Sequence, residues 1–384
     1  MGSLEYDLRH GLKNLDQMLR TARLRLSSRS VSVTRQLLEE HPAPADHEWG
    51  PGPWLVVDLH TTRPDGQQGR RSYALIAYFV RAGYRVGMVA NRGFIGNIDR
   101  KLKRLLLEHP MVVIDEVDAF GGGDATLLTD RSRRTLPEGF ERQIAVKTSG
   151  PFEPARGEVA FPFTLHPTTL HLGMDSDLER LREIPRRWRV FFSGVCSKAS
   201  YDTHWIRREF GMVPRSRVLE ILSEELPTEV PTSADEVENL LTREVPGFVW
   251  PPESAAAIPP ERWLEVVAHA AVFAAAPGVS YPMCHNIIEA MAVGTVPLTE
   301  YPEQFDPPLR HRENCLVYRG EDELRCRTRE IAGMAPAQLA ALGQAAADYY
   351  DHHIAPEAFI RGLEADPRPT VVLHLKGYER PPAG

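Results

Sequence analysis

The sequence predicts an α/β protein with two Rossmann-like, doubly wound domains. Two occurrences of one pattern support this fold class. Near the start, apolar runs at Trp54–His60 and Arg85–Ala90 enclose a helical segment, and near the end a strand, helix, strand unit spans Ala271–Glu300. This order is the unit of a parallel sheet. The 384 residues are enough for two such domains, each with its own core.

The amino-acid composition and net charge indicate a folded globular protein that does not mainly bind nucleic acid. Apolar residues make up 42% and charged residues 25%, which are globular values that argue against wholesale disorder. A formal charge of −7 argues against nucleic acid as the main partner. The four cysteines show neither a CxxC pair nor metal spacing, so we expect reduced thiols in a cytoplasmic protein. We expect no membrane span and no signal peptide, because no apolar run has the required length and position.

Residues 1–50 are expected to form a helical extension. Leucines and Met18 recur at helical spacing within Leu4–Leu38, with Arg and Lys between them. One interpretation is a basic amphipathic helix that touches a membrane surface or a partner chain. Because Glu5, Asp7 and Asp16 are mixed with the basic residues, we favour a helical cap packed on its own domain.

The first domain is expected to alternate strands and helices after a Pro/Gly-rich connector. The predicted elements are strands at 54–60, 85–90, 111–114, 143–148 and 159–165, with helices at 72–82 and 95–108. Ligands of open α/β sheets collect at the carboxyl ends of the strands. Asp58, His60 and the 61–71 loop follow the first strand, and the acidic stretch 115–118 follows the third.

The second domain is expected to repeat this alternation. The predicted elements are strands at 188–192, 217–222, 247–250, 271–276, 295–298 and 314–318, with helices after 198 and at 235–241, 261–270, 282–293 and 303–309. The most specific stretch is 271–300. There Pro277-Gly278 ends a strand, and His285 and Glu289 share one helix face near the helix N-terminus. Unpaired N–H groups at such an end favour a phosphate.

This stretch carries a family resemblance. The run PGVSYPMCHNIIEAMAVGTVPLTEY resembles the donor-binding motif of GT-B glycosyltransferases, and it is most similar to exostosin-like and related sugar-nucleotide transferases. The resemblance implies the GT-B architecture, in which two Rossmann-like domains face a central cleft. It also implies that Glu289 binds the ribose, while Ser280, His285 and Asn286 face the diphosphate or the sugar.

The strand at 188–192 and the loop after it are similar to the same transferases. By this resemblance Gly194 permits close backbone approach, and Lys198 and one of Arg207 and Arg208 supply positive charge to the leaving diphosphate. Trp250 is the expected stacking partner of the base. Because such enzymes use these groups instead of a divalent ion, we expect no tightly bound metal.

One departure from the family pattern bears on the mechanism. Retaining members often carry a second acid eight residues before the helix Glu, where this chain has Tyr281. We therefore favour an inverting reaction, which needs a general base for the acceptor hydroxyl. Loop position favours His60 and Asp65 as this base, with Asp58, Asp118 and Asp124 as alternatives. The three glycines at 121–123 are expected to form a turn or lid beside the acceptor.

The sequence thus predicts a cytoplasmic, bacterial glycosyltransferase. It would move a sugar from a UDP-, GDP- or similar nucleotide sugar to a carbohydrate or glycoconjugate acceptor. The expected domains are a helical extension (1–50), an acceptor domain (51–184), a nucleotide-sugar domain (185–350) and a C-terminal crossover helix and tail (351–384). A sugar-nucleotide epimerase and a non-catalytic scaffold remain alternatives. Peripheral membrane contact through the N-terminal helix and a homodimer stay open.

Overall fold

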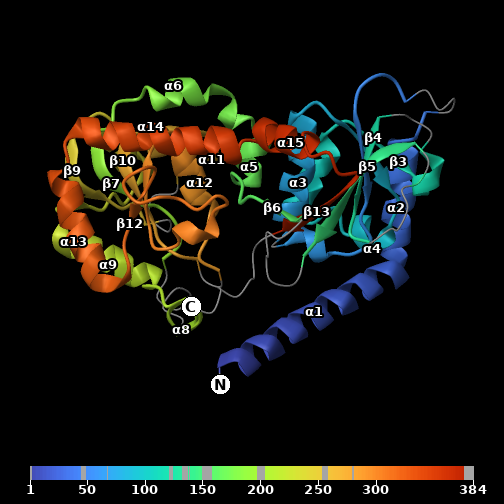
Figure 1. The fold of residues 1–384 in the computed structure, drawn as a ribbon, viewed down its shortest axis with the longest axis horizontal. Helices are drawn as coiled ribbons and strands as arrows, with labels where there is room; N and C mark the ends of the chain where they lie inside the picture. Colours follow the sequence, from blue (N-terminus) through green and yellow to red (C-terminus); the bar gives the residue numbers. More distant parts are fainter. Residues whose placement is uncertain are drawn as a thin grey trace. The chain divides into compact units, whose positions relative to one another are not determined.

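The structure is a computed structural model that describes residues 2–44, 49–66, 68–120, 124–131, 137, 139–148, 158–196, 204–252, 258–278 and 281–375. The chain forms two compact units (Figure 1). Unit 1 contains Met1–Phe161 and Pro356–Lys376, and unit 2 contains Pro162–Ala355. The predicted boundary lies at residue 184, whereas the contacts divide the chain after Phe161 and return it to unit 1 at Pro356.

The N-terminal extension is helical, as predicted, and it divides into two helices. These are α1 (Gly2–Leu26) and α2 (Ser28–Glu40). Ser27 between them has extended backbone angles, φ −75° and ψ 129°, which interrupt the helical path. Among the helices that the structure describes, none is long and apolar enough to cross a bilayer.

A seven-stranded parallel sheet forms the centre of unit 1, with the strand order β3-β2-β1-β4-β5-β13-β6. The strands are β1 (Trp54–Asp58), β2 (Arg85–Val89), β3 (Met111–Ile114), β4 (Ala125–Thr129), β5 (Phe140–Lys147), β6 (Glu158–Phe161) and β13 (Thr370–Leu375). The sequence did not predict β4 or β13. In Figure 1 the red strand β13 lies among strands from early in the chain, since it pairs with both β5 and β6.

Helices and short 3-10 turns surround this sheet. They include α3 (Arg70–Arg81), α4 (Arg92–Ile95), α15 (Pro356–Glu364), η1 (Arg63–Asp65), η2 (Lys103–Glu108) and η3 (Val117–Ala119). The prediction of one helix over 95–108 is wrong, because α4 ends early and a 3-10 segment follows. The physical reason is Lys103, whose ammonium group is fully buried against Asp65 and so draws the chain inward. Phe359 of α15 packs edge-on against Tyr78 of α3.

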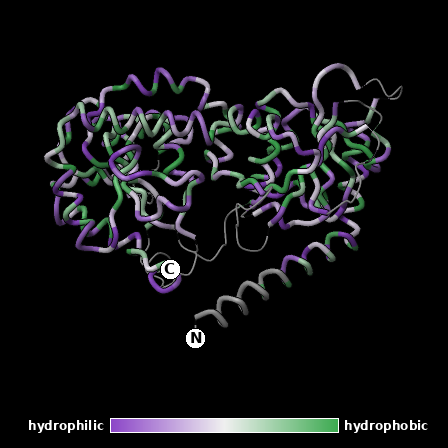
Figure 2. Tube along the Cα trace, in the orientation of Figure 1, coloured by the Kyte–Doolittle hydropathy of each residue, from purple (hydrophilic) through white to green (hydrophobic). Residues whose placement is uncertain are grey.

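The core of unit 1 is aromatic at one end of its sheet. Trp49 and Trp54 meet edge to face at 5.3 Å, and Phe120 lies 4.4 Å from Trp49 between ring centroids. Figure 2 shows apolar segments concentrated inside each unit and polar segments on the outside. Both units therefore have their own core, as a two-domain α/β chain requires.

Unit 2 contains a six-stranded parallel sheet with the order β12-β11-β10-β7-β9-β8. Its strands are β7 (Trp188–Phe191), β8 (Thr228–Glu229), β9 (Val245–Val249), β10 (Ala270–Ala275), β11 (Val296–Thr299) and β12 (Leu316–Val317). Together the two sheets confirm the predicted fold class, α/β with two Rossmann-like units, which is the fold class of GT-B enzymes.

The helices of unit 2 are α5 (Pro167–His171), α6 (Leu178–Arg182), α8 (His204–Phe210), α9 (Arg215–Glu225), α10 (Ala234–Leu241), α11 (Pro260–Ala268), α12 (His285–Ala292), α13 (Gly320–Gly333) and α14 (Pro336–His353), with 3-10 turns η4 (Met174–Asp177) and η5 (Pro302–Gln304). The prediction of a strand at 217–222 is wrong, since these residues belong to α9. Arg217 pairs with Glu220 and Glu224 on the outer face of α9, which is helical spacing.

Candidate functional site

In each unit, polar groups gather where the direction of the strand order reverses. In unit 1 the first and fourth strands, β1 and β4, are neighbours, and in unit 2 the neighbours are β7 and β10. Ligands of open α/β sheets bind outside the carboxyl ends of strands at such switch points. The candidate site residues are described first for unit 1 and then for unit 2.

His60 lies at the switch point of unit 1 and is bound to the loops on both sides of it. Its ring nitrogen Nε2 is 2.8 Å from Oδ1 of Asp58, the last residue of β1. Asn91, which follows β2, donates from Nδ2 to the same oxygen at 2.7 Å. The backbone N–H of His60 and the hydroxyl of Thr61 both donate to the Asp130 carboxylate, which follows β4. The structure thus connects the ends of three strands through the loop that carries His60, with Asp58 next to the imidazole.

Helix α1 supports this loop from outside. Arg25 donates from Nη2 to the carbonyl oxygen of His60 at 3.0 Å, and the hydroxyls of Thr21 and Thr62 lie 3.4 Å apart. Gly93 is required at this contact, because a Cβ there would lie 2.2 Å from the His60 carbonyl oxygen. The His60 loop is therefore fixed between α1 and α4.

Asp65, the other predicted base, lies in the interior of unit 1. The carboxylate and the Lys103 ammonium are both 0% exposed and form an ion pair at 2.8 Å. Ser72 donates to Asp65 Oδ1 and Asn97 donates to Oδ2. Burial lowers the pKa of Lys103, and the Asp65 charge opposes that shift. This arrangement stabilises the loop and leaves the carboxylate away from solvent, so a catalytic role for Asp65 stays an untested prediction.

In unit 2, Arg215 connects the loops at the switch point. Its guanidinium is nearly buried and donates to the carbonyl oxygens of Val195, after β7, and Pro277, after β10. It also contacts Cys284 Sγ at 3.1 Å, just before α12. Cys284 is thus packed against the guanidinium. The Arg215 guanidinium thus connects three segments: the loop after β7, the loop after β10 and the residue before α12.

Gly194 and Asn286 lie beside Arg215. Gly194 has φ +147°, a conformation that favours glycine, and a Cβ there would approach Asn286 Nδ2 to 3.7 Å. Asn286 donates from Nδ2 to the Ser193 carbonyl at 3.1 Å. His285, the first residue of α12, has its ring centroid 4.8 Å from that of His166. The structure therefore brings together three of the predicted donor-site residues, Gly194, His285 and Asn286.

Glu289 also lies on α12, and its side chain is buried. Its side chain is 1% exposed, and Oε1 accepts from the His166 N–H and the Thr169 hydroxyl. Oε2 accepts from Trp263 Nε1 at 2.6 Å. The predicted ribose contact is untested, and it requires a ribose hydroxyl to replace one of these donors.

Two other predicted residues lie at different parts of unit 2. Arg207 of α8 is 60% exposed and lies 3.4 Å from the Glu321 carboxylate at the start of α13. Trp250 follows β9 and stacks on Phe248 with 6.4 Å between ring centroids. Its indole Nε1 is buried and has no hydrogen-bond partner within the described part of the chain. The predicted contacts of Arg207 with the diphosphate and of Trp250 with the base remain predictions.

Some predicted residues are outside the description. Lys198, Ser280 and the glycines 121–123 fall among residues that the structure does not describe. Within the described ranges, no group of three or more His, Cys, Asp and Glu side chains has the geometry of a metal site.

Sequence reasoning missed Arg215 as a site residue, because residues 217–222 were interpreted as a strand. A usable signal was present. Pro214 directly precedes Arg215, and proline before a helical segment is a common helix start. An arginine at the start of a helix that follows a Gly-containing loop would then have been a candidate for the same site.

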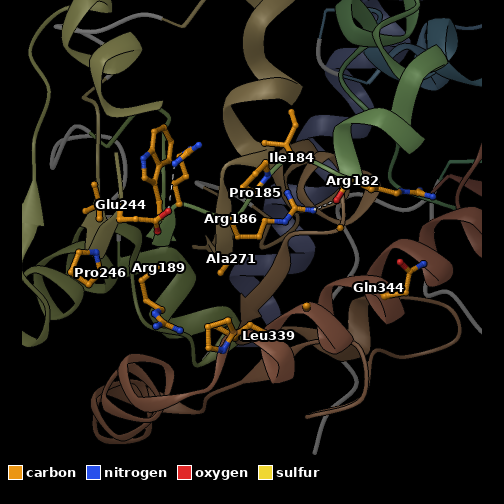
Figure 3. A pocket seen from close by; sticks show the side chains of 16 residues that line it. Arg182, Ile184, Pro185, Arg186, Arg189, Glu244, Pro246, Ala271, Leu339 and Gln344 are labelled. Atoms are coloured by element: carbon orange, nitrogen blue, oxygen red, sulfur yellow. Dashed lines mark hydrogen bonds and ion pairs between the residues drawn. The ribbon is translucent and has the colours of Figure 1, made fainter. Parts of the chain in front are cut away.

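A cavity of about 510 Å³ lies at the opposite, amino end of the unit 2 sheet (Figure 3). Among its lining residues, Arg186 donates to the carbonyl oxygens of Val293 and Ala268, at the ends of α12 and α11. Burial lowers the pKa of Arg186 to about 10. Arg182 forms a two-pronged pair with Asp351, both contacts at 2.7 Å. These arginines neutralise helix C-termini, so we assign the cavity a structural role.

No family model matches the chain, and no curated protein matches it. Solved structures that resemble it include AviGT4, a glycosyltransferase involved in avilamycin A biosynthesis, with 14% identity, a TM-score of 0.41 and coverage of 82% of this chain and 97% of that chain. Anabaena Alr3699/HepE in complex with UDP shows 11% identity, a TM-score of 0.43 and coverage of 81% and 99%. The structure of Anabaena Alr3699/HepE in complex with UDP and glucose shows 12% identity, a TM-score of 0.41 and coverage of 81% of this chain and 99% of that chain. Because these TM-scores are low, the function proposed below rests on residues of this chain.

Proposed function

We propose that this protein is a glycosyltransferase that moves a sugar from a nucleotide-sugar donor to an acceptor hydroxyl. The observation that carries the proposal is the Arg215 arrangement at the switch point of unit 2. A cation, a glycine with φ +147° and the N-terminus of α12 meet there. This combination favours a diphosphate, which offers negative charge and several hydrogen-bond acceptors.

The donor is assigned to unit 2. In our proposal the diphosphate binds beside Gly194, Asn286 and the first turn of α12, and Arg215 holds the two loops in position for it. Glu289 takes the ribose hydroxyls after one of its present donors is displaced, and Trp250 stacks on the base. UDP is the first nucleotide to test, because the sequence predicts a UDP-, GDP- or similar nucleotide sugar as the donor.

The acceptor is assigned to unit 1, with His60 as the general base. Asp58 Oδ1 lies 2.8 Å from Nε2, and we propose that a small rotation of the ring lets Nε2 donate to it, which leaves Nδ1 as the accepting nitrogen. The acceptor oxygen attacks the anomeric carbon, its proton goes to His60, and the bond from that carbon to the diphosphate oxygen breaks. This direct displacement inverts the anomeric configuration.

Fixed positive groups take the place of a divalent ion in this proposal. The leaving diphosphate gains negative charge as the glycosidic bond breaks, and preorganised N–H donors and guanidinium charge lower the energy of that state. Lys198 and Arg207 are the further sequence-based candidates for this role. We therefore propose a metal-independent reaction.

The test is a binding screen of the purified chain with UDP, GDP, CMP, dTDP and ADP, with and without Mg²⁺, followed by turnover of the matching nucleotide sugars. A ligand that binds only the folded state raises the melting temperature. We expect one nucleotide to raise it equally with and without Mg²⁺, and its sugar conjugate to release that nucleotide on turnover. Binding without any turnover would favour the scaffold, and turnover to an isomeric nucleotide sugar would favour the epimerase.

A further inference from the structure

One side of α1 exposes large apolar side chains. Leu12, Leu15, Met18 and Leu19 are 63%, 52%, 57% and 49% exposed, and Leu26 at the helix end is 87% exposed. With about 3.6 residues per turn, these five side chains follow one stripe along the helix. We call them the apolar stripe of α1. The sequence favoured a cap packed on its own domain, and such a cap would bury this stripe.

The opposite side of α1 is the one that attaches to unit 1. Thr21 is buried next to Thr62, and Arg25 donates to the His60 carbonyl oxygen. Position 21 is about half a turn from both Leu12 and Leu19 in angular terms. The helix therefore already uses its polar side for internal packing and presents its leucines outward. In Figure 1 the C-terminal end of α1 meets unit 1 near α2 and α4, with which it is in contact.

Positive charge accompanies the apolar stripe. Between Gln17 and Leu38 the chain contains five arginines and no acidic residue: Arg20, Arg23, Arg25, Arg29 and Arg35. The whole chain has a formal charge of −7, so this excess is local. Arg20 and Arg29 pair with Asp16 and Asp99, so Arg23 is the arginine that brings positive charge to the edge of the stripe, and a second copy of α1 would add like charge there. A surface of anionic lipid headgroups supplies the complementary charge and an apolar layer below it.

We propose that α1 docks on an anionic membrane surface, with the apolar stripe inserted at the boundary between headgroups and acyl chains. Arg23 lies on the same side as the leucines and contacts the lipid phosphates, whereas Arg20 lies on the flank of the helix and pairs with Asp16. This inference does not depend on the glycosyl transfer proposed above. Because the polar side of α1 carries Arg25 and Thr21, the docked helix also holds the His60 loop.

The test is co-sedimentation of the full chain with vesicles of phosphatidylcholine alone or with roughly a third phosphatidylglycerol. We expect binding to the anionic vesicles that weakens as salt rises. The variant Leu12→Ser/Leu15→Ser/Leu19→Ser should bind at least about tenfold more weakly, since the apolar area is lost. Arg23→Ala should bind about fivefold more weakly. Leu172→Ser, at a site 44% exposed in unit 2, is the matched control and should bind like the parent chain.

Three outcomes would overturn the inference. They are no binding to either vesicle, equal binding of the triple variant, and a dimer in sedimentation equilibrium that the triple variant dissociates while no vesicle binds. The last outcome would assign the stripe to a second copy of the chain. Circular dichroism and thermal melts of each variant show that it is folded, and all of the changed side chains are exposed, so folding is expected to be retained.

Discussion

His60 Nε2 lies 2.8 Å from Asp58 Oδ1 at the carboxyl end of β1, and Asn91 fixes the same carboxylate oxygen at 2.7 Å. The imidazole thus lies beside a buried carboxylate, although its Nε2 makes no hydrogen bond among the described residues. Asp130 holds the backbone of the same loop through the His60 N–H. The backbone of the loop is fixed, and an acidic neighbour lies within reach of the ring, which suits a general base with a positioning partner.

Replacing His60 by Ala should remove turnover while nucleotide binding is retained. We expect kcat to fall by about 10²- to 10⁴-fold, since a positioned general base contributes that much. Asp58→Asn should lower kcat by less and leave KM for the donor unchanged, because it acts through His60. Steady-state kinetics and the melting shift with nucleotide measure the two effects. A donor KM that rises with kcat unchanged would exclude the base assignment.

Asp65→Asn should act on stability rather than on turnover per folded molecule. The change leaves the Lys103 ammonium buried without its opposite charge, and breaking such a pair costs about 3–5 kcal/mol. Urea unfolding measures this loss, and Asp65→Asn/Lys103→Met should recover part of it. Asp99→Asn, which removes an exposed pair with Arg29, is the control and should cost at most about 1 kcal/mol. If Asp65→Asn instead lowers kcat and leaves the free energy of unfolding unchanged, Asp65 is the better candidate for the general base.

Asn286→Ala should weaken nucleotide binding by roughly fivefold. It removes the bond that holds the Ser193 carbonyl and with it the Gly194 loop, at a cost of about 1 kcal/mol. Arg215→Lys should have a similar effect, because lysine cannot reach Val195, Pro277 and Cys284 at once. Isothermal titration with the nucleotide from the screen gives the affinities. Arg207→Ala tests the sequence-based alternative, and a larger loss there than at Asn286 would place the diphosphate near α8.

Glu289 tests whether the ribose displaces a protein donor. If the predicted contact forms, the parent chain should bind UDP roughly tenfold more tightly than 2′,3′-dideoxy-UDP, and Glu289→Gln should lose this preference. Tryptophan fluorescence should change on UDP binding, because Trp263 donates to Glu289 in the free protein. Trp263→Phe is the control for that signal. Equal binding of both nucleotides, with Glu289→Gln only less stable, would make Glu289 a structural anchor.

His269 should make unit 2 less stable in mild acid. Burial lowers its pKa from 6.5 to about 4. A base whose pKa is lower in the folded state stabilises the fold fully above pH 6.5, and this contribution is lost as the pH falls from there toward 4. Since the ring is only partly buried, we expect about 1 kcal/mol over that range.

The measurement is urea unfolding of the parent chain and His269→Gln near neutral pH and near pH 5. The parent chain should lose more stability between the two pH values than the variant does. Equal losses would show that other groups cause the pH dependence.

The sequence by itself determined the α/β class and the position of most elements. Consecutive apolar residues at β1, β2, β3 and β10 identify buried parallel strands, because both faces of such a strand are covered. Proline and glycine around α12 mark its limits within a few residues. These features are local, since neighbouring residues decide them. The candidate residues Gly194, His285 and Asn286 came from the resemblance of these stretches to a donor-binding motif.

Only the tertiary structure decided which distant residues meet. The strand β13 joins the sheet of unit 1 through pairing with β5, more than two hundred positions earlier in the chain. Arg215 reaches the loops after β7 and β10, and Lys103 neutralises Asp65, because the folded chain brings helix starts next to loops that are distant in sequence. The leucines of α1 are exposed because the side of the helix that carries Thr21 packs on the rest of unit 1. Periodicity shows that a helix has two faces, whereas the partner that each face meets depends on the folded chain.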